Sequence, residues 1–295
     1  MMYQKFRGIN FSKICFGCEP LGGFNWGNVN LSQIEKAISI SIDLGINFFD
    51  TADVYGLGLS EKRLSRILGE KRHEMIIATK GGVSWKKKGS KIITSRNISA
   101  KYIRLAVEDS LRRLRLDILP VYFIHWPDNK SDILETFSLL ARLQEEQKIG
   151  LIGCSNFSYE EIQKALKVSD ISLIQAPLNI IDGMPDKKIL KLCTKKDIKI
   201  VAYNVLYSGL LSGKYNEDSK FLKNDRRSRL KSFSKKNLKE NFKIINKLKE
   251  KSEKTNQSLL KLSLEWPFKN ENVLSLITGI KNSKQIIENV MALKK

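Results

Sequence analysis

The chain alternates between short apolar segments and longer amphipathic segments, and this alternation repeats eight times. The apolar segments are rich in β-branched residues and read as strands that are buried on both faces. The segments between them carry apolar residues at helical spacing, as at Ile34, Ala37, Ile38 and Ile42. Eight strand–helix units favour a parallel sheet whose faces are covered by helices.

The predicted elements follow this alternation. The strands are expected at Ile14–Phe16, Asn47–Thr51, Met75–Thr79, Leu119–Ile124, Ile149–Cys154, Ser172–Ala176, Lys199–Tyr203 and Val273–Ile277. The helices are expected at Ile34–Ile42, Ser60–Leu68, Ser99–Leu114, Ile133–Gln147, Ser158–Val168, Asp186–Lys196, Lys235–Lys251, Gln257–Trp266 and Ser283–Leu293. Two helix starts, Ser32–Glu35 and Ser158–Glu161, have the S-x-x-E form of a capping box.

Eight units in 295 residues predict a closed (β/α)8 barrel, the TIM barrel, as one domain over residues 1–295. A short β-hairpin, Tyr3–Phe6 with Phe11–Ser12, is expected to cap it. A doubly wound open sheet is the alternative. That fold normally carries G-x-G-x-x-G after its first strand, and the glycines of Gly17–Gly23 lack this spacing.

Composition bounds the class of protein. The hydrophobic fraction of 42% and the mean hydropathy of -0.27 are typical of a soluble globular protein. No apolar run approaches the roughly 20 residues that span a bilayer, and the N-terminus lacks a signal-peptide core. We therefore expect a cytoplasmic protein without a membrane partner.

The cysteines do not predict a metal site. Cys15 and Cys18 form a C-x-x-C, but no second Cys/His pair follows them. Residues three apart on a strand also point to opposite faces.

The formal net charge of +21 is spread along the chain, mostly on Lys, and is densest over Lys214–Lys251. No nucleic-acid recognition motif accompanies it, so we expect a solvated basic surface that attracts small anions.

Polar side chains at the ends of the predicted strands indicate chemistry, because TIM barrels carry their working residues there. Asp50 and Tyr55 follow the second strand, Lys80 ends the third, and His125 ends the fourth. Lys80 beside Tyr55 is expected to lower the phenol pKa from about 10, with Asp50 holding the lysine charged. His125 would orient a carbonyl oxygen against the Tyr55 hydroxyl. Together these groups predict protonation of a carbonyl oxygen as hydride arrives at carbon.

From about Lys13 to Val290 the sequence resembles the aldo-keto reductases. The motifs that carry the resemblance are Phe49-Asp-Thr-Ala-Asp-Val-Tyr-Gly56 with Ser60-Glu61, Ala78-Thr-Lys80, Tyr122-Phe-Ile-His-Trp-Pro-Asp128, Gly153-Cys-Ser-Asn156, Gln175, Gly209-Leu-Leu-Ser-Gly-Lys-Tyr215 and Gly279–Asn289. The resemblance implies that Asp50, Tyr55, Lys80 and His125 are the catalytic tetrad. It implies an NADPH-dependent reductase of aldehydes or ketones, with Tyr55 as general acid.

The resemblance also implies the cofactor-binding residues. The nicotinamide carboxamide would bind Ser155, Asn156 and Gln175, and its ring would stack on Tyr203, with Cys18 and Asp50 near the ribose. The pyrophosphate would lie along Gly209, Leu211 and Ser212. The adenosine end would bind Lys281, Ser283, Gln285, Glu288 and Asn289.

Two departures from the family pattern concern the cofactor. Relatives often have Arg near the 2'-phosphate site, whereas here Lys281 and Lys284 supply the cations, so use of NADH is a second possibility. Asn204-Val205 stands where Ser-Pro is common, beside the expected pyrophosphate loop.

Substrate residues are expected beyond the strand ends. Trp26, Trp85 and Trp126 are candidates for an aromatic-walled pocket. The run Lys86–Lys88 suggests a phosphorylated, sugar-derived or otherwise anionic carbonyl substrate. A cofactor-sensing regulatory barrel with little turnover is the alternative function, and a charge-driven nucleic-acid binder is a third.

Overall fold

The computed structural model describes residues 3–23, 26–89 and 91–294. Eight parallel strands close into a barrel in the order β10-β11-β12-β3-β4-β5-β8-β9, which confirms the predicted TIM barrel. Closure is made by β12 and β3, whose pairing runs from Leu276 with Ile14 to Gly279 with Gly17. The barrel strands are β3 (Ile14–Gly17), β4 (Phe48–Asp50), β5 (Ile76–Gly81), β8 (Leu119–Ile124), β9 (Ile149–Ser155), β10 (Ile171–Pro177), β11 (Lys199–Tyr203) and β12 (Val273–Gly279).

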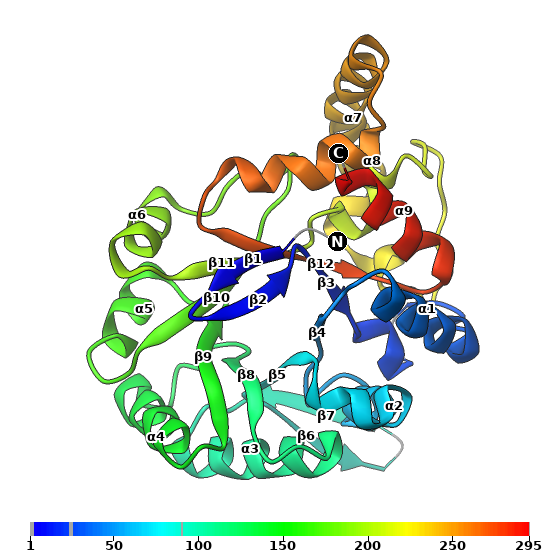
Figure 1. Ribbon diagram of the computed structural model, residues 1–295. Helices are drawn as coiled ribbons and strands as arrows, with labels where there is room; N and C mark the ends of the chain where they lie inside the picture. The colour runs from blue at the N-terminus through cyan, green and yellow to red at the C-terminus, as the bar shows by residue number, and fades with distance from the viewer. Residues whose placement is uncertain (1–2, 24–25, 90, 295) are drawn as a thin grey trace.

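Helices surround the barrel as an outer layer, visible as the ring of coils in Figure 1. Their apolar faces pack on the strands, and one large cluster of buried side chains fills the space between the two layers. The helices are α1 (Leu31–Asp43), α2 (Leu59–Leu68), α3 (Ala100–Leu114), α4 (Ile133–Glu145), α5 (Tyr159–Ala165), α6 (Lys187–Lys196), α7 (Lys235–Thr255), α8 (Leu259–Glu265) and α9 (Ser283–Leu293).

The barrel interior is a separate apolar cluster, built from the inward side chains of the strands. Phe48, Val121, Phe123, Leu173 and Val201 belong to it. At one end it is closed by the hairpin of β1 (Tyr3–Phe6) and β2 (Ile9–Ser12), which lies across the barrel in Figure 1. The predicted N-terminal cap is therefore confirmed, and it leaves the opposite end, where the strands terminate, for the polar residues.

Helix starts confirm one of the two predicted capping boxes. Ser158 accepts from the Glu161 backbone N–H, while the Glu161 carboxylate accepts from the Ser158 N–H. The prediction at Ser32 is wrong, because Asn30 caps α1 by accepting from the backbone N–H of Gln33. Asn and Ser are comparably good N-caps, so the earlier residue took the position.

A second hairpin, β6 (Val83–Lys88) with β7 (Lys91–Arg96), lies between β5 and α3, where no strand was predicted. A long excursion also follows β11. It contains the 3₁₀ helices η3 (Tyr207–Ser212), η4 (Arg226–Arg229) and η5 (Lys231–Phe233) and leads into α7, which projects beyond the barrel in Figure 1. A separate apolar cluster, which includes Leu211, Phe233 and Phe242, packs this excursion.

All four cysteines are free thiols that are buried. Cys15 lies in the barrel interior, whereas Cys18 packs with the outer cluster. Burial raises the pKa of both thiols well above 9. Among the described residues, no group of three or more His, Cys, Asp or Glu side chains is arranged to hold a metal ion. No helix in these ranges is both long and apolar enough to cross a bilayer.

Asp53 is a buried carboxyl group behind the loop that follows β4. It is 1% exposed, and neither of its carboxyl oxygens has a hydrogen-bond partner in the structure. Its backbone N–H donates to the Lys80 carbonyl oxygen at 3.0 Å. The groups that face it are Glu61 of α2, Arg113 and Tyr102 of α3, Lys80 of β5 and Tyr122 of β8.

Burial raises the pKa of Asp53 well above 3.8, and the Glu61 carboxylate raises it further. Arg113 opposes the rise only in part, because it is already paired with Glu61. Asp53 is therefore a carboxyl group that keeps its proton at pH values where an exposed aspartate has lost it.

Asp53→Asn should stabilise the protein at neutral pH. The unfolded chain loses the Asp53 proton near pH 4 while the folded chain retains it, so wild-type stability falls as pH rises above that value. The asparagine variant lacks this loss and should gain on the order of 1–3 kcal/mol at pH 7, with little difference at pH 4. Urea denaturation across this range measures it. An equal difference at both pH values would show that Asp53 is ionised in the folded state.

Candidate active site

Four polar side chains meet at the open end of the barrel, as the sequence predicted. Asp50 ends β4, Lys80 lies near the end of β5, and His125 follows β8 directly. Tyr55 stands in the turn after β4. The Lys80 Nζ donates to Asp50 Oδ1 at 2.7 Å and lies 3.5 Å from the Tyr55 hydroxyl oxygen. The rings of Tyr55 and His125 lie 5.8 Å apart at 83°.

Lys80 and Asp50 form an ion pair within the protein, at side-chain exposures of 2% and 4%. Lys80 donates a further bond to the Thr51 carbonyl oxygen at 2.8 Å. The second oxygen of Asp50 accepts from the Gln175 amide at 2.6 Å. Every charged atom of the pair thus has a partner, which is the condition for a buried ion pair to persist.

His125 is held in its neutral form. Burial lowers its pKa well below 6.5, and the nearby charge of Lys80 lowers it further. Its Nδ1 is buried without a hydrogen-bond partner in the structure. A neutral imidazole carries one N–H donor and can donate to a carbonyl oxygen without adding charge.

The expected lowering of the Tyr55 pKa does not occur in this structure. Burial raises it well above 10, and the carboxylates of Glu19 and Asp50 raise it further. The Lys80 ammonium is paired with Asp50 and lies 4.9 Å from the centre of the Tyr55 ring. Arg226 is the cation that lowers the Tyr55 pKa, and it partly offsets Glu19.

The residues expected at the nicotinamide lie beside these four. Asn156 Nδ2 donates to the His125 carbonyl oxygen at 3.0 Å, and its Oδ1 accepts from the Tyr203 hydroxyl at 2.7 Å. Ser155 accepts from the same Asn156 amide at 2.9 Å. Asn156 adopts a left-handed conformation, at φ 64°, a region in which asparagine is enriched. The amide groups are therefore fixed to the tetrad itself.

The loop after β11 forms a tight left-handed turn. Ser208 and Gly209 have φ values of 52° and 101°. Asn204 closes the turn, since its Oδ1 accepts from the Ser208 backbone N–H at 2.9 Å. The departure at Asn204 thus supplies a side-chain bond that holds the turn. Gly209 and Ser212 line the cavity above it, whereas Leu211 is fully buried below.

The far end of the cavity is formed by β12 and the start of α9. Lys281 Nζ donates to the Trp26 carbonyl oxygen at 2.6 Å and lies 5.3 Å from the centre of that indole ring. Gln285 accepts from the Lys281 backbone N–H at 2.8 Å. Glu288 pairs with Lys214 at 3.5 Å. Ser283 begins α9 and does not line the cavity, whereas Gln285, Glu288 and Asn289 do.

These residues enclose one elongated cavity of about 610 Å³, with the tetrad at one end and Asn289 at the other. Its donors, its cations and the Tyr203 ring are the groups that an extended dinucleotide needs. The Thr278 hydroxyl lines the cavity and is buried without a partner in the structure, so it is free to bond a ligand. The cavity therefore fits a nicotinamide dinucleotide.

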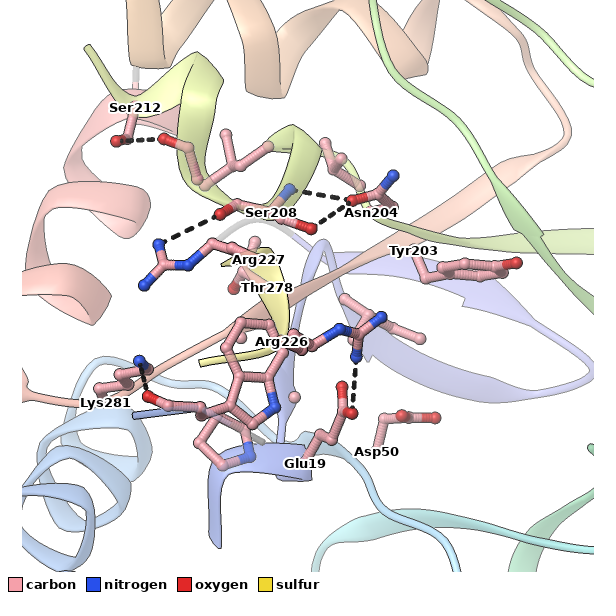
Figure 2. Close-up of a pocket in the computed structure, with 18 of the residues that line it drawn as sticks. Glu19, Asp50, Tyr203, Asn204, Ser208, Ser212, Arg226, Arg227, Thr278 and Lys281 are labelled. Atoms are coloured by element: carbon pink, nitrogen blue, oxygen red, sulfur yellow. Dashed lines mark hydrogen bonds and ion pairs between the residues drawn. The ribbon is translucent and has the colours of Figure 1, made fainter. Parts of the chain in front are cut away.

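Sequence reasoning missed one wall of this cavity. The strap, residues 216–230, crosses from the excursion to the loop after β3, where Asp225 pairs with Trp26 as a β-bridge. Its Arg226 and Arg227 line the cavity, as does Glu19, and all three are labelled in Figure 2. The strap's sequence has no periodic pattern, so only the adjacent arginines could have marked it.

The three tryptophans that were predicted to line a substrate pocket divide into two groups. Trp26 and Trp126 line the cavity, whereas Trp85 lies in β6 and does not. Arg96 of the paired strand lies 4.5 Å above the Trp126 ring. Lys86 and Lys88 lie on the face of this hairpin opposite to Trp85 and Arg96, because successive side chains along a strand alternate between the two faces. The Lys87 side chain lies outside what the structure describes.

The comparisons with known proteins agree with this geometry. The family model for the aldo/keto reductase family matches residues 13–295. Aldo-keto reductase YhdN of Bacillus subtilis is 33% identical over 263 residues, covering 88% of this chain and 78% of the relative. The NADH-specific methylglyoxal reductase of Escherichia coli is 29% identical over 300 residues, covering 97% and 90%.

A solved structure, that of a glycerol dehydrogenase from Gluconobacter oxydans, superposes with a TM-score of 0.90 at 33% identity. The match covers 99% of this chain and 90% of that one. The sequence motifs, the closed barrel and the family match all lead to one assignment. The chain belongs to the aldo/keto reductase family of oxidoreductases, which reduce carbonyl compounds.

Proposed function

We propose that the protein reduces an aldehyde or ketone to the alcohol with NADPH, and that Tyr55 donates the proton. The observation that carries this proposal is the tetrad geometry. The Tyr55 hydroxyl lies 3.5 Å from Lys80 Nζ and beside a neutral His125. The bound cofactor would supply hydride to the carbonyl carbon. The contribution of the chain is to hold the carbonyl oxygen and to protonate it.

In this mechanism the carbonyl oxygen lies between Tyr55 and His125. His125 donates a hydrogen bond to it, and the Tyr55 O–H proton moves to it as negative charge develops. The phenolate that remains is stabilised by the Lys80 ammonium, which the ion pair with Asp50 holds in place. In the oxidation of an alcohol, the same phenolate accepts the proton.

The cofactor would bind through the residues that line the elongated cavity. Ser155, Asn156 and Gln175 offer amide and hydroxyl groups for the carboxamide, and Tyr203 offers a ring face. NADPH is favoured over NADH because Lys281 and Arg227 place cations at the end where a 2'-phosphate would bind. The E. coli relative is named NADH-specific, so NADH is the alternative.

Tyr55→Phe should lower the rate of carbonyl reduction by roughly 10²–10⁴-fold, because the proton donor is lost. NADPH affinity, measured by quenching of tryptophan fluorescence, should hardly change. Tyr102→Phe, outside the cavity, is the matched control and should retain activity. Substantial turnover by Tyr55→Phe would contradict the assignment. Bound NADPH that is not oxidised by any aldehyde in a single turnover would instead favour a cofactor-sensing protein.

Lys281→Met should raise the Kd for NADPH roughly tenfold and leave the Kd for NADH nearly unchanged, since a charged hydrogen bond to the 2'-phosphate is lost. Lys284→Met is the control, because the Lys284 side chain is exposed on α9 and, contrary to the expectation from the sequence, does not line the cavity. Direct binding titrations with both cofactors measure the ratio. Equal losses for NADPH and NADH would show that Lys281 acts only through its bond to Trp26.

We expect Arg96 to favour an anionic substrate, because it lies over the ring of Trp126, which lines the cavity. Lys86 and Lys88 lie on the other face of the hairpin. Arg96→Gln should lower kcat/KM for a phosphorylated aldehyde by roughly two- to fivefold relative to the unphosphorylated aldehyde. Lys91→Gln, which removes one charge from the tip of the same hairpin, should alter both substrates equally. If both variants change the ratio to the same extent, a diffuse positive field rather than Arg96 recognises the anion.

A further inference from the structure

Glu19 and Arg226 form an ion pair inside the cavity, with Arg226 Nη1 at 2.7 Å from Glu19 Oε1. Figure 2 shows the pair directly beside Asp50. Both side chains line the cavity together with Tyr55, and they are about one-third exposed. Glu19 comes from the loop after β3, whereas Arg226 comes from the strap. The pair therefore joins two separate walls of the cavity at the position of the proton donor.

The Glu19 side of this pair is fixed to the Tyr55 loop. Glu19 begins the 3₁₀ helix η1 (Glu19–Gly22), and the backbone of Gly22 lies directly against Tyr55 and Gly56. A Cβ atom on Gly22 would lie 2.7 Å from the Gly56 nitrogen, so only glycine allows this approach. The Ser60 hydroxyl also donates to the Cys18 carbonyl oxygen at 2.9 Å. The helix that carries Glu19 and the loop that carries Tyr55 are thus one packed unit.

The Arg226 side of the pair is fixed to the strap. Asp225 caps the short helix η4 and forms the β-bridge with Trp26. The Gly27 N–H donates to the Asn224 carbonyl oxygen at 3.3 Å. The Arg226 guanidinium also lies 5.2 Å from the centre of the Trp26 ring. The strap thus meets the loop after β3 through a few polar contacts, and the bond to Glu19 joins two charges that both act on Tyr55.

The charges around Tyr55 occur in two balanced pairs. Lys80 from β5 faces Asp50 from β4, and Arg226 faces Glu19. His125 and Tyr203 complete the surroundings and are neutral. The pKa of Tyr55 is raised first by burial, then by Glu19 and Asp50, while Arg226 lowers it. If Arg226 were withdrawn, Glu19 would become an unbalanced negative charge near the phenol.

We propose that Glu19 and Arg226 are positioning residues through which contact of the strap controls proton transfer at Tyr55. The proposal rests on the proposed role of Tyr55 as the proton donor. With the strap in contact, Arg226 balances Glu19, and the phenol releases its proton more readily. Without this contact, the Glu19 carboxylate opposes formation of the phenolate. Proton transfer is thereby favoured when the strap covers the cavity.

Two single substitutions should act in opposite directions. Glu19→Gln removes the negative charge and should increase the ionised fraction of Tyr55 at a fixed alkaline pH by roughly two- to fivefold. Arg226→Gln leaves Glu19 unbalanced and should decrease this fraction by a similar factor. The double variant should return close to wild type. Arg226→Lys, which keeps the charge, should also remain close to wild type.

The readout needs no cofactor. Tyrosinate absorbance is titrated in each variant, with and without Tyr55→Phe, at pH values where circular dichroism shows a folded protein. The difference reports Tyr55 alone. The pH dependence of kcat for alcohol oxidation should shift in the same order, because that direction needs the phenolate. Removal of a second inter-element pair, by Glu35→Gln and Arg66→Gln, is the control and should leave both readouts unchanged.

The outcomes separate this proposal from the proposed function. Shifts of Glu19→Gln and Arg226→Gln in the same direction, or no shift in either, would overturn the coupling even if the wild type reduces aldehydes. A wild type that reduces no carbonyl would overturn the proposed function, while the absorbance titration would still decide whether Glu19 and Arg226 act on Tyr55.

Discussion

The buried pair of Lys80 and Asp50 is the interaction on which the site depends. Two charges taken out of water are costly unless every donor and acceptor finds a partner. Here the groups come from three parts of the barrel. Asp50 ends β4 with Thr51 directly after it, Lys80 lies on β5, and Gln175 lies on β10. In the closed strand order β10 lies across the barrel from β4, so the Gln175 amide reaches Asp50 through the barrel axis. Closure of the sheet is therefore a condition for a stable charge at this point.

Much of the fold could be predicted from the sequence because its signals are local. Buried parallel strands and amphipathic helices have distinct periodicities, and a polar residue at a strand end is visible without any tertiary information. The tetrad could be assembled for this reason. The β6–β7 hairpin was missed because its run of lysines resembles a solvated loop. The Asn30 cap was missed because Ser32 offered a more familiar pattern.

The remaining features depend on contacts between distant segments. The strap has no periodic pattern, and Glu19 meets Arg226 across 207 positions of the chain. The direction of the shift in the Tyr55 pKa was predicted wrongly for the same reason. The sequence showed the neighbouring Lys80, but it did not show how deeply the phenol is buried or that Glu19 approaches it. Local patterns located the four polar residues at the strand ends, whereas the electrostatic balance around them follows from packing.

The net charge of +21 is carried mainly outside the cavity. In the part of the chain that the structure describes, four of the five lysines and arginines that line the cavity have carboxylate partners: Lys80 with Asp50, Arg226 with Glu19, Arg227 with Asp225 and Lys214 with Glu288. Lys281 donates instead to a backbone carbonyl oxygen. An anion that enters must compete with these carboxylates for each of the four paired cations. Selectivity for a dinucleotide then depends on how well its phosphates replace them, which total charge alone would not provide.

The four buried thiols can serve as native probes of barrel opening. Cys15 lies in the barrel interior, Cys18 directly before η1, Cys154 on β9 and Cys193 on α6, and burial raises the pKa of each. A thiol in this state resists alkylation and oxidation while its surroundings stay closed. The rate at which each cysteine is labelled therefore reports how often its own sector of the ring opens to solvent. The chain carries four such probes without any substitution.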